Sequence, residues 1–406
     1  METLLNLLTN SSLAYVLNGT IVVILLFLAF RTSYIKKWSN DNLLSSVVEK
    51  NYQKDRLPVV ILIPNRNEKR IGDTLKSVMK QTKKPKHVVI VFNNMTDNGF
   101  SEKITRKILE ISDLDYTLLF MENNPNLKSG ALNFGYSWIK ENLKGSDYKY
   151  ICQMDSDTEL DKNFLEYTYN GLENNPSVGA ISSSFVGNPK LVKKSNMLYW
   201  MQHFEYVKYH NSSIFKEVNV ISGTGNLLRI KALEEINEKF NTVWDNNSQV
   251  EDYSLTLNLK KLGWKTRKST ECVVYTDLMP TVKDLVHQRL RWQRGTFDEL
   301  FKRGFTKVTY VDYLKEIRFL LMTFLELSIY LILLYGFING LRKYNLIFMF
   351  FPLVIISIYN LYYAKNLPFK IILSILGILP LIIYNILRLF WWFTSLFTFR
   401  KIKWHE

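Results

Sequence analysis

Two aspartates separated by one small residue carry the clearest chemical signal in this sequence. Asp155-Ser156-Asp157 follows the apolar run Tyr150–Met154, which has the composition of a buried strand. Carboxylates this close together suit a hard divalent cation that also binds diphosphate oxygens. Such a cation can neutralise the charge that develops on a nucleoside-diphosphate leaving group. A solvated acidic turn is the structural alternative, and the position after an apolar strand favours the metal site.

A second acidic pair, Glu251-Asp252, stands directly before the helical pattern Tyr253–Leu262. Acidic residues in the first turn of a helix complement the helix dipole, and the local sequence alone favours this structural role. The chemical alternative is that one of the two carboxylates acts as a general base on an acceptor hydroxyl. The pair becomes a catalytic candidate only with support from the rest of the chain.

The basic segment Gln288–Trp292 combines groups that can bind phosphate and sugar. The planar guanidinium of Arg291 can bind a diphosphate, and the flat indole of Trp292 can lie against a sugar ring. Gln288 lies about one helical turn earlier and would face the same side. An interfacial helix that anchors on lipid headgroups explains the same composition, and the two interpretations are compatible.

The segment Lys128–Asn133 lies at the start of a predicted helix. Gly130 permits a close approach of the backbone, and the start of a helix favours anions. A plain helix start explains the segment equally well. Another small-residue segment, Gly223–Gly225, has the pattern of an ordinary turn.

To bring these groups together, the chain needs a scaffold in which several strand ends meet. From about Leu57 to Asp277, apolar β-branched runs alternate with helical patterns, which predicts an α/β fold with a mostly parallel sheet covered on both faces. Ligands of such sheets bind beyond the carboxyl ends of the strands, where the polar segments fall. The expected strands are Val59–Ile63, Lys86–Phe92, Thr117–Met121 and Tyr150–Met154. The expected helices are Ile71–Gln81, Ser101–Ile111 and Lys128–Glu141.

Composition narrows the class of protein. The 406 residues carry a net charge of +15, but the basic residues are spread along the chain, and many of them flank apolar segments. Anionic lipid headgroups attract basic residues in such positions, so this distribution argues against a nucleic-acid partner. The 2 cysteines and 5 scattered histidines cannot form a disulfide framework or a zinc site.

Long uncharged segments predict that the α/β region is attached to a membrane. Leu13–Phe30 is long enough to cross a bilayer and is followed by Arg31, Lys36 and Lys37, which by the positive-inside rule place the middle domain in the cytoplasm. Three carboxy-terminal segments are also almost free of charge: Phe319–Leu341, Tyr344–Tyr363 and Ile371–Leu387. We therefore expect an integral membrane protein of the cell or plasma membrane, with the number of spans left open.

The expected division of the chain follows from these segments. It comprises an amino-terminal transmembrane anchor and linker (1–56), a cytoplasmic α/β domain (57–279), an interfacial amphipathic region (280–316) and a carboxy-terminal α-helical transmembrane bundle (317–406).

Five motifs resemble, in order, those of the membrane-bound members of glycosyltransferase family 2: Ile63–Glu68, Lys128–Asn133, Asp155–Asp157, Glu251-Asp252 and Gln288–Trp292. The pattern is most similar to the processive synthases of cellulose, chitin, hyaluronan and poly-N-acetylglucosamine. Each motif alone is modest, but their order and spacing from about Leu57 to Gly295 make the similarity specific. It implies that the α/β domain has the GT-A fold and transfers a sugar from a UDP-sugar, with inversion and with Mg²⁺ or Mn²⁺.

The same resemblance implies roles for individual residues. Asp155 would contact the diphosphate of the donor, Asp157 would bind the metal, and Asp252 would be the base that deprotonates the acceptor hydroxyl. This last role reverses the preference of the local pattern for a helix cap. The other donor-binding residues that it implies are Pro64, Asn67, Glu68, Asn93, Lys128 and Asn133. The acceptor-binding residues that it implies are Gln202, Glu205, Glu251, Gln288, Arg291 and Trp292.

One position departs from the family pattern. The family usually has an aspartate after its second strand, where it meets the uracil base, and this sequence has Asn93 there. The side-chain oxygen of Asn93 can still accept a hydrogen bond from uracil N3–H, so a uridine donor stays the expectation.

Two enzymatic functions fit the resemblance. The first is a processive synthase that polymerises one sugar and exports the product through its own bundle; a small bundle leaves room for a homo-oligomer or an accessory export protein. The alternative is a non-processive glycolipid synthase that transfers one sugar to a ceramide- or diacylglycerol-type acceptor. A non-enzymatic transporter or scaffold is disfavoured because the polar motifs lie outside the predicted spans. The expected partners are a nucleotide-sugar donor, a glycan or lipid acceptor and membrane lipids, and the sequence does not identify the sugar.

Overall fold

The computed structural model covers most of the predicted α/β domain and the helices that follow it. The residues that it describes are 56–143, 148–190, 198–199, 201–203, 205–206, 217–338 and 378–399. All of the predicted site residues fall within these ranges. The predicted amino-terminal anchor Leu13–Phe30 and the predicted span Tyr344–Tyr363 lie outside them.

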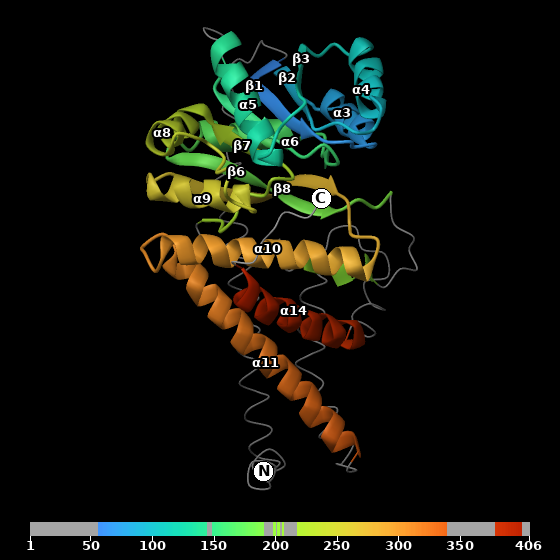
Figure 1. The fold of residues 1–406 in the computed structure, drawn as a ribbon, viewed down its shortest axis with the longest axis vertical. Coiled ribbons are helices and arrows are strands. Elements are labelled where there is room, and N and C mark those ends of the chain that lie inside the picture. Colours follow the sequence, from blue (N-terminus) through green and yellow to red (C-terminus); the bar gives the residue numbers. More distant parts are fainter. Residues whose placement is uncertain are drawn as a thin grey trace.

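An eight-stranded sheet forms the centre of the α/β domain (Figure 1). Its strands are β1 (Arg56–Asn65), β2 (Lys84–Asn93), β3 (Tyr116–Met121), β4 (Tyr150–Gln153), β5 (Glu159–Leu160), β6 (Val178–Gly187), β7 (Asn226–Arg229) and β8 (Lys265–Thr276). In space they follow the order β3-β2-β1-β4-β7-β6-β8-β5. The half that runs from β3 to β4 is parallel throughout, as the sequence predicts.

Helices cover both faces of the sheet because side chains alternate along each strand. Ile61 and Ile63 of β1 pack in one apolar core, and Val60 and Leu62 pack in the other. The first core is closed by α3 (Ile71–Met79), α4 (Phe100–Glu110) and α6 (Phe164–Glu173). The second is closed by α5 (Leu127–Asn142), α8 (Ile230–Phe240) and α9 (Glu251–Lys261). Strands buried on both faces have near-continuous apolar sequences, which is why β1 and β2 are recognisable in the sequence.

The second half of the sheet corrects the prediction of a mostly parallel sheet. β7 pairs antiparallel with both β4 and β6, β5 pairs antiparallel with β8, and only β6 and β8 pair in parallel there. The physical reason is that β6 ends and β7 begins at the same edge of the sheet, so β7 runs back against its neighbours. Asn226, the first residue of β7, therefore lies opposite Gln153, the last residue of β4. The segment before β7 is thereby brought to the carboxyl end of β4.

Three further helices follow the sheet. Figure 1 shows α10 (Val282–Arg303) lying across the molecule below α9, with α11 (Tyr310–Ile338) and α14 (Ile378–Thr398) on its far side. The helix α10 begins after Thr281, whose hydroxyl accepts a hydrogen bond from the Asp284 amide at 3.1 Å and so caps the helix. The predicted basic, amphipathic region is thus largely one helix, which lies below the sheet and α9 in Figure 1.

Among the residues that the structure describes, no helix is both long enough and apolar enough to cross a membrane. The predicted span Phe319–Leu341 overlaps α11, and the predicted span Ile371–Leu387 overlaps α14. Both spans, like the division of the chain into domains, stay predictions.

Candidate active site

A cavity of about 420 Å³ lies where the carboxyl ends of the strands face α10. It brings together most of the residues predicted for the site: Lys128, Asp155, Asp157, Glu205, Glu251, Asp252, Gln288, Arg291 and Trp292. These residues come from the end of β4, the starts of α5 and α9, the segment before β7 and the middle of α10. The cavity is also lined by residues that the sequence did not single out for chemistry, among them Ser222, Gly223, Thr224, Asp277 and Met279.

Lys128 links two of the acidic groups. It stands in the first turn of α5, and its ammonium nitrogen lies 2.6 Å from Asp155 Oδ1 and 2.8 Å from Glu251 Oε1. Burial would lower the pKa of Lys128, but the two carboxylates beside it raise this pKa. Burial also disfavours ionised Glu251, yet the neighbouring Lys128 ammonium lowers the pKa of its carboxyl. Lys128 is therefore charged, and it ties the start of α9 to the end of β4.

Asp252 has the surroundings of a proton acceptor. Its Oδ2 accepts a hydrogen bond from the Gly223 amide at 3.2 Å, and its Oδ1 accepts one from the Tyr253 amide at 2.8 Å. Burial, and after it the charge of Glu251, raises the pKa of Asp252 to about 6. A carboxyl group with this pKa is ionised at neutral pH and takes up a proton more readily than an ordinary aspartate.

Gly223, for which the sequence predicts only a turn, lines the cavity and donates its amide to Asp252. A Cβ atom at this position would lie 2.8 Å from Lys128 Nζ and 3.7 Å from Asp252 Oδ2. The first distance is shorter than a normal contact, so a side chain here would require the Lys128 ammonium, which two ion pairs hold, to shift. The local sequence does not signal this role, because the partner carboxylate lies far along the chain and meets Gly223 only through the reversal of β7.

Asp157 lies after the end of β4 and Glu68 after the end of β1, and both carboxylates are of the hard oxygen type that Mg²⁺ and Mn²⁺ prefer. Burial, and after it the charge of Glu68, raises the pKa of Asp157. Burial also raises the pKa of Asp155 to about 6, against the opposing effect of Lys128. Within the described ranges there is no group of three or more histidine, cysteine, aspartate or glutamate side chains that could hold a metal ion by itself. Mg²⁺ is commonly held by one or two carboxylates together with substrate phosphates, and the donor set present here fits such a shared site.

Four residues of α10 line the cavity, and a fifth contacts two of them. Gln288, Arg291, Trp292 and Thr296 line it. Arg289, which the sequence analysis did not select, is only 4% exposed and donates to Glu205 Oε2 from Nε at 2.9 Å and from Nη2 at 2.6 Å. Its guanidinium also lies over the Trp292 ring, 4.4 Å from the centroid.

Glu205 therefore has protein partners at a position where the family resemblance implies an acceptor contact. Burial would raise the pKa of Glu205, but the Arg289 guanidinium beside it lowers this pKa. The Tyr384 hydroxyl of α14 donates to the same carboxylate oxygen that Arg289 contacts. Glu205 thus joins α10 to α14 and lines the cavity as well.

Two other predicted site residues brace the backbone and do not line the cavity. Gln202 is fully buried; its side-chain nitrogen donates to the Met279 carbonyl at 2.9 Å, and its oxygen accepts from the Met279 amide at 2.9 Å. Asn133 does the same for Trp244, donating to its carbonyl at 2.7 Å and accepting from its amide at 3.1 Å. Met279 lines the cavity and Trp244 lies in the segment before α9, so each amide acts on the site through the segment that it holds.

The predicted donor residues near β1 and β2 lie outside the cavity lining. Pro64 is buried in β1. Asn67 accepts from the Thr96 amide at 2.8 Å and so connects the segments that follow β1 and β2. Asn93 is 2% exposed and donates to the Asn65 carbonyl at 3.0 Å. This burial gives Asn93 a role in joining the two strands, and its contact with a nucleotide base stays a prediction.

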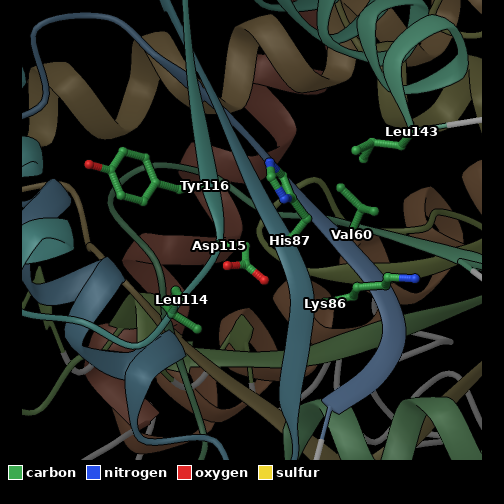
Figure 2. Close-up of a pocket in the computed structure, with 7 residues that line it drawn as sticks. All are labelled: Val60, Lys86, His87, Leu114, Asp115, Tyr116 and Leu143. Carbon is green, nitrogen blue, oxygen red and sulfur yellow. The ribbon is translucent and has the colours of Figure 1, made fainter. Parts of the chain in front are cut away.

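Another cavity, of about 440 Å³, lies at the opposite ends of the strands (Figure 2). Its lining comes from the first residues of β2 and β3 and from neighbouring segments: Val60, Lys86, His87, Leu114, Asp115, Tyr116 and Leu143. Burial lowers the pKa of His87, whose ring pairs with the Thr117 hydroxyl at 2.9 Å. None of the predicted site residues lines this cavity, so the first cavity is the candidate active site.

Two family models match the chain. A family model described as "Glycosyl transferase family group 2" matches residues 150–400, and one described as "Glycosyl transferase family 2" matches residues 59–237. Together they span the strands, the acidic segments and α10.

Two curated relatives are poly-β-1,6-N-acetyl-D-glucosamine synthases. The protein from Staphylococcus epidermidis is 25% identical over 267 residues, which is 64% of this chain and 59% of the relative. The protein from Staphylococcus aureus (strain COL) is 26% identical over 241 residues, which is 58% of this chain and 53% of the relative. The chain thus spans little more than half the length of these relatives.

A solved structure shares the fold. It is the mannosyltransferase PcManGT from Pyrobaculum calidifontis in complex with GDP-Man and Mn²⁺, with a TM-score of 0.53 and 16% identity, and the match covers 94% of this chain and 99% of that one. At this identity the likeness concerns the fold alone. It confirms a GT-A-like α/β architecture built on a mixed sheet.

Proposed function

Because the chain belongs to glycosyl transferase family group 2 and is a glycosyltransferase, we propose that it adds sugar units from a UDP-sugar to a growing polysaccharide, with inversion at the anomeric carbon. The observation that supports this best is the position of Asp252 in one cavity with Lys128 and Trp292. A base, a cation for a diphosphate and a flat surface for a sugar are what a single-displacement sugar transfer needs in one place.

Asp252 is the proposed base. It accepts the proton of an acceptor hydroxyl, whose oxygen forms a bond to the anomeric carbon. The bond between that carbon and the diphosphate oxygen breaks, and UDP leaves with its electron pair. The two backbone amides that bind Asp252 hold the carboxylate in one orientation without neutralising it. A positioned base of this kind contributes roughly 10²- to 10⁴-fold to the rate.

Charge in the cavity supports a metal-assisted departure of UDP. Among the lining residues that the structure describes, the only basic side chains are Lys128 and Arg291, and Lys128 is already paired with two carboxylates. A diphosphate entering this cavity therefore needs further positive charge. Mg²⁺ or Mn²⁺ bound by Asp157, with Glu68 nearby, would supply it by neutralising charge on the leaving group. Arg291 is exposed and can bind phosphate oxygens directly.

On the acceptor side, Trp292 offers its ring to a sugar, and Gln288 lies one helical turn before it on the same wall of the cavity. The names of the two staphylococcal relatives make poly-N-acetylglucosamine the first product to test, with UDP-N-acetylglucosamine as the donor. Processive extension and export of the product are part of the proposal.

A single transfer to a lipid acceptor is the second candidate. The observation that favours it is the basic and aromatic composition of Gln288–Trp292, which also suits a helix that lies against lipid headgroups. We also propose that the enzyme is an integral membrane protein with its active site in the cytoplasm. The uncharged segments of the sequence and the basic residues that flank them support this placement. A homo-oligomer or an accessory protein would be needed if the bundle is too small for export.

The test is to incubate the purified chain in nanodiscs with a panel of UDP-sugars and either Mn²⁺ or Mg²⁺. UDP release is followed, and the product is sized by mass spectrometry. UDP release with one sugar, abolished by EDTA and restored by the metal, together with a ladder of products, supports the polysaccharide synthase. A product with one sugar on an added lipid supports the second candidate, and no release with any UDP-sugar refutes both.

A further inference from the structure

The segment that carries the proposed base and the helix that carries Trp292 meet at a glycine. Gly295 is buried on α10, three residues after Trp292. It faces Val250, which precedes Glu251-Asp252 and stands at the start of α9. Glycine is among the least favourable residues for the interior of a helix, so its use here requires a reason in the packing.

The space between the two segments is too small for a methyl group. A Cβ atom on residue 295 would lie 2.7 Å from Val250 Cγ1, 2.8 Å from its Cγ2 and 3.3 Å from its Cβ. Valine is stiff about its first side-chain torsion because it is branched at Cβ. Rotation cannot move both methyl groups away and leaves the branch carbon in place. A side chain at residue 295 must therefore displace the backbone of one of the two segments.

The rest of the interface limits which way that displacement can go. Toward the far end of α10, Arg303 donates to Asn258 Oδ1 at 2.8 Å and to Ser254 Oγ at 2.9 Å, both on α9. Leu300 of α10 packs in one apolar cluster with Val250, Tyr253 and Leu257. With α9 held at these points, an intrusion at residue 295 acts mainly on the segment that leads into Asp252.

We propose that Gly295 is a positioning residue for the transfer reaction. Its missing side chain lets α10 approach Val250 closely enough for Asp252 and Trp292 to face one acceptor. The proposal rests on the proposed function for the roles of these two residues. Gly295 itself touches neither substrate; it sets the distance between the base and the surface that holds the acceptor sugar.

The test is a mutant cycle with Gly295→Ala, Val250→Ala and the double variant, each made in the full chain and assayed in nanodiscs. Gly295→Ala is expected to lower kcat about tenfold to a hundredfold, because small misplacements of reacting groups have effects of this size. The donor KM should change less than about twofold, since Asp155 stands at the end of β4 and Lys128, although it pairs with Glu251 on the displaced segment, keeps its ion pair with Asp155. The double variant should recover most of the kcat of Val250→Ala, because removal of the two valine methyl groups restores the space.

A kcat of Gly295→Ala equal to that of the wild type would overturn the proposal, as would a double variant that remains as impaired as Gly295→Ala. A purely structural role predicts a different pattern, with lower thermal stability and a loss of donor binding together. If the substitution only destabilised the folding of α10, the double variant would not recover the kcat of Val250→Ala.

Hydrogen exchange of the segment from residue 248 to residue 255 supplies a measurement that does not depend on activity. Exchange should be faster in Gly295→Ala and return toward the Val250→Ala level in the double variant. If the wild-type chain releases no UDP with any donor, the proposed function fails, and the exchange cycle still decides the positioning role. Exchange unchanged by Gly295→Ala would then overturn the inference.

Discussion

The two walls of the cavity are built from different kinds of contact. The donor-side wall, defined by Lys128, Asp155 and Asp157, stands on the end of β4 and the start of α5, which the parallel half of the sheet places side by side. The acceptor-side wall, defined by Asp252 and by Gln288, Arg291 and Trp292, stands on two helices that meet through side-chain packing.

The acceptor-side wall should therefore be the easier of the two to displace. Backbone hydrogen bonds along β1 and β4 hold the end of β4, whereas the acceptor-side wall depends on the fit of α9 against α10. Lys128 crosses from one wall to the other through its ion pair with Glu251. Substitutions should therefore separate into those that act on donor binding and those that act on turnover or the acceptor.

The largest effect is expected from Asp252→Asn. Loss of the proposed base should lower kcat by roughly 10²- to 10⁴-fold, while the affinity for UDP-sugar stays close to that of the wild type because the donor-side wall is intact. Steady-state UDP release and equilibrium binding of the donor measure the two effects. Asp113→Asn, an exposed carboxylate paired with Lys84 far from the cavity, is the matched control. Retained turnover in Asp252→Asn would remove this residue from the reaction.

The pH dependence of kcat should show the ionisation of Asp252 in the acceptor-side wall. Because the pKa of Asp252 is raised to about 6, kcat should be level above that pH and fall about tenfold per unit below it as the base is protonated. Asp155 also has its pKa raised to about 6, so the acid limb reports the coupled group and not a single residue. A level profile down to pH 5 would contradict the assignment of the base.

The free energy of unfolding should fall as pH rises through the range in which kcat rises. A folded-state pKa raised above that of the unfolded chain contributes stability that is present below the unfolded value and is lost as pH rises through the folded value. For Asp155 and Asp252 the loss therefore falls between about pH 4 and pH 6. Thermal unfolding across this range, compared with the double variant carrying Asn at both positions, measures their contribution.

Trp292→Ala should affect the acceptor more than the donor. Removing the ring that faces the sugar is expected to raise the KM for an oligosaccharide acceptor about tenfold, which corresponds to about 1.4 kcal/mol of binding. Trp292→Phe keeps a flat ring and should recover part of the loss. An equal increase in the donor KM would show that the two walls are not independent.

The smallest effect on activity is expected from Asn133→Ala. This variant tests whether Asn133 serves the donor-side wall or supports the segment that leads into the acceptor-side wall. The family resemblance assigns Asn133 to the donor, but its side chain holds Trp244 in the segment before α9. We expect a loss of stability of about 1–3 kcal/mol, because two backbone groups of Trp244 lose their partner, with little change in the donor KM. A large rise in the donor KM without a loss of stability would restore the assignment to the donor.

The donor-side wall is the part of the site that can be predicted from the sequence. Asp155 and Asp157 directly follow a buried strand, and in a parallel sheet the carboxyl end of a strand is where ligands bind. The proposed role of Asp252 as the base rests on the family resemblance, because its local pattern favours a helix start. The resemblance predicts Gln202 for the acceptor and Asn133 for the donor, whereas their partners in the structure are backbone groups that lie far away in the sequence.

The sequence by itself determined the alternation of strands and helices in the first half of the sheet, because hydrophobic periodicity is a property of residues that are neighbours along the chain. It also determined which carboxylates were available. Only the tertiary structure decided which groups meet: Gly223 with Asp252, Arg289 with Glu205, and Gly295 with Val250. Such contacts depend on distances of a few ångströms between segments far apart in the chain, and these are set by the close packing of the whole domain.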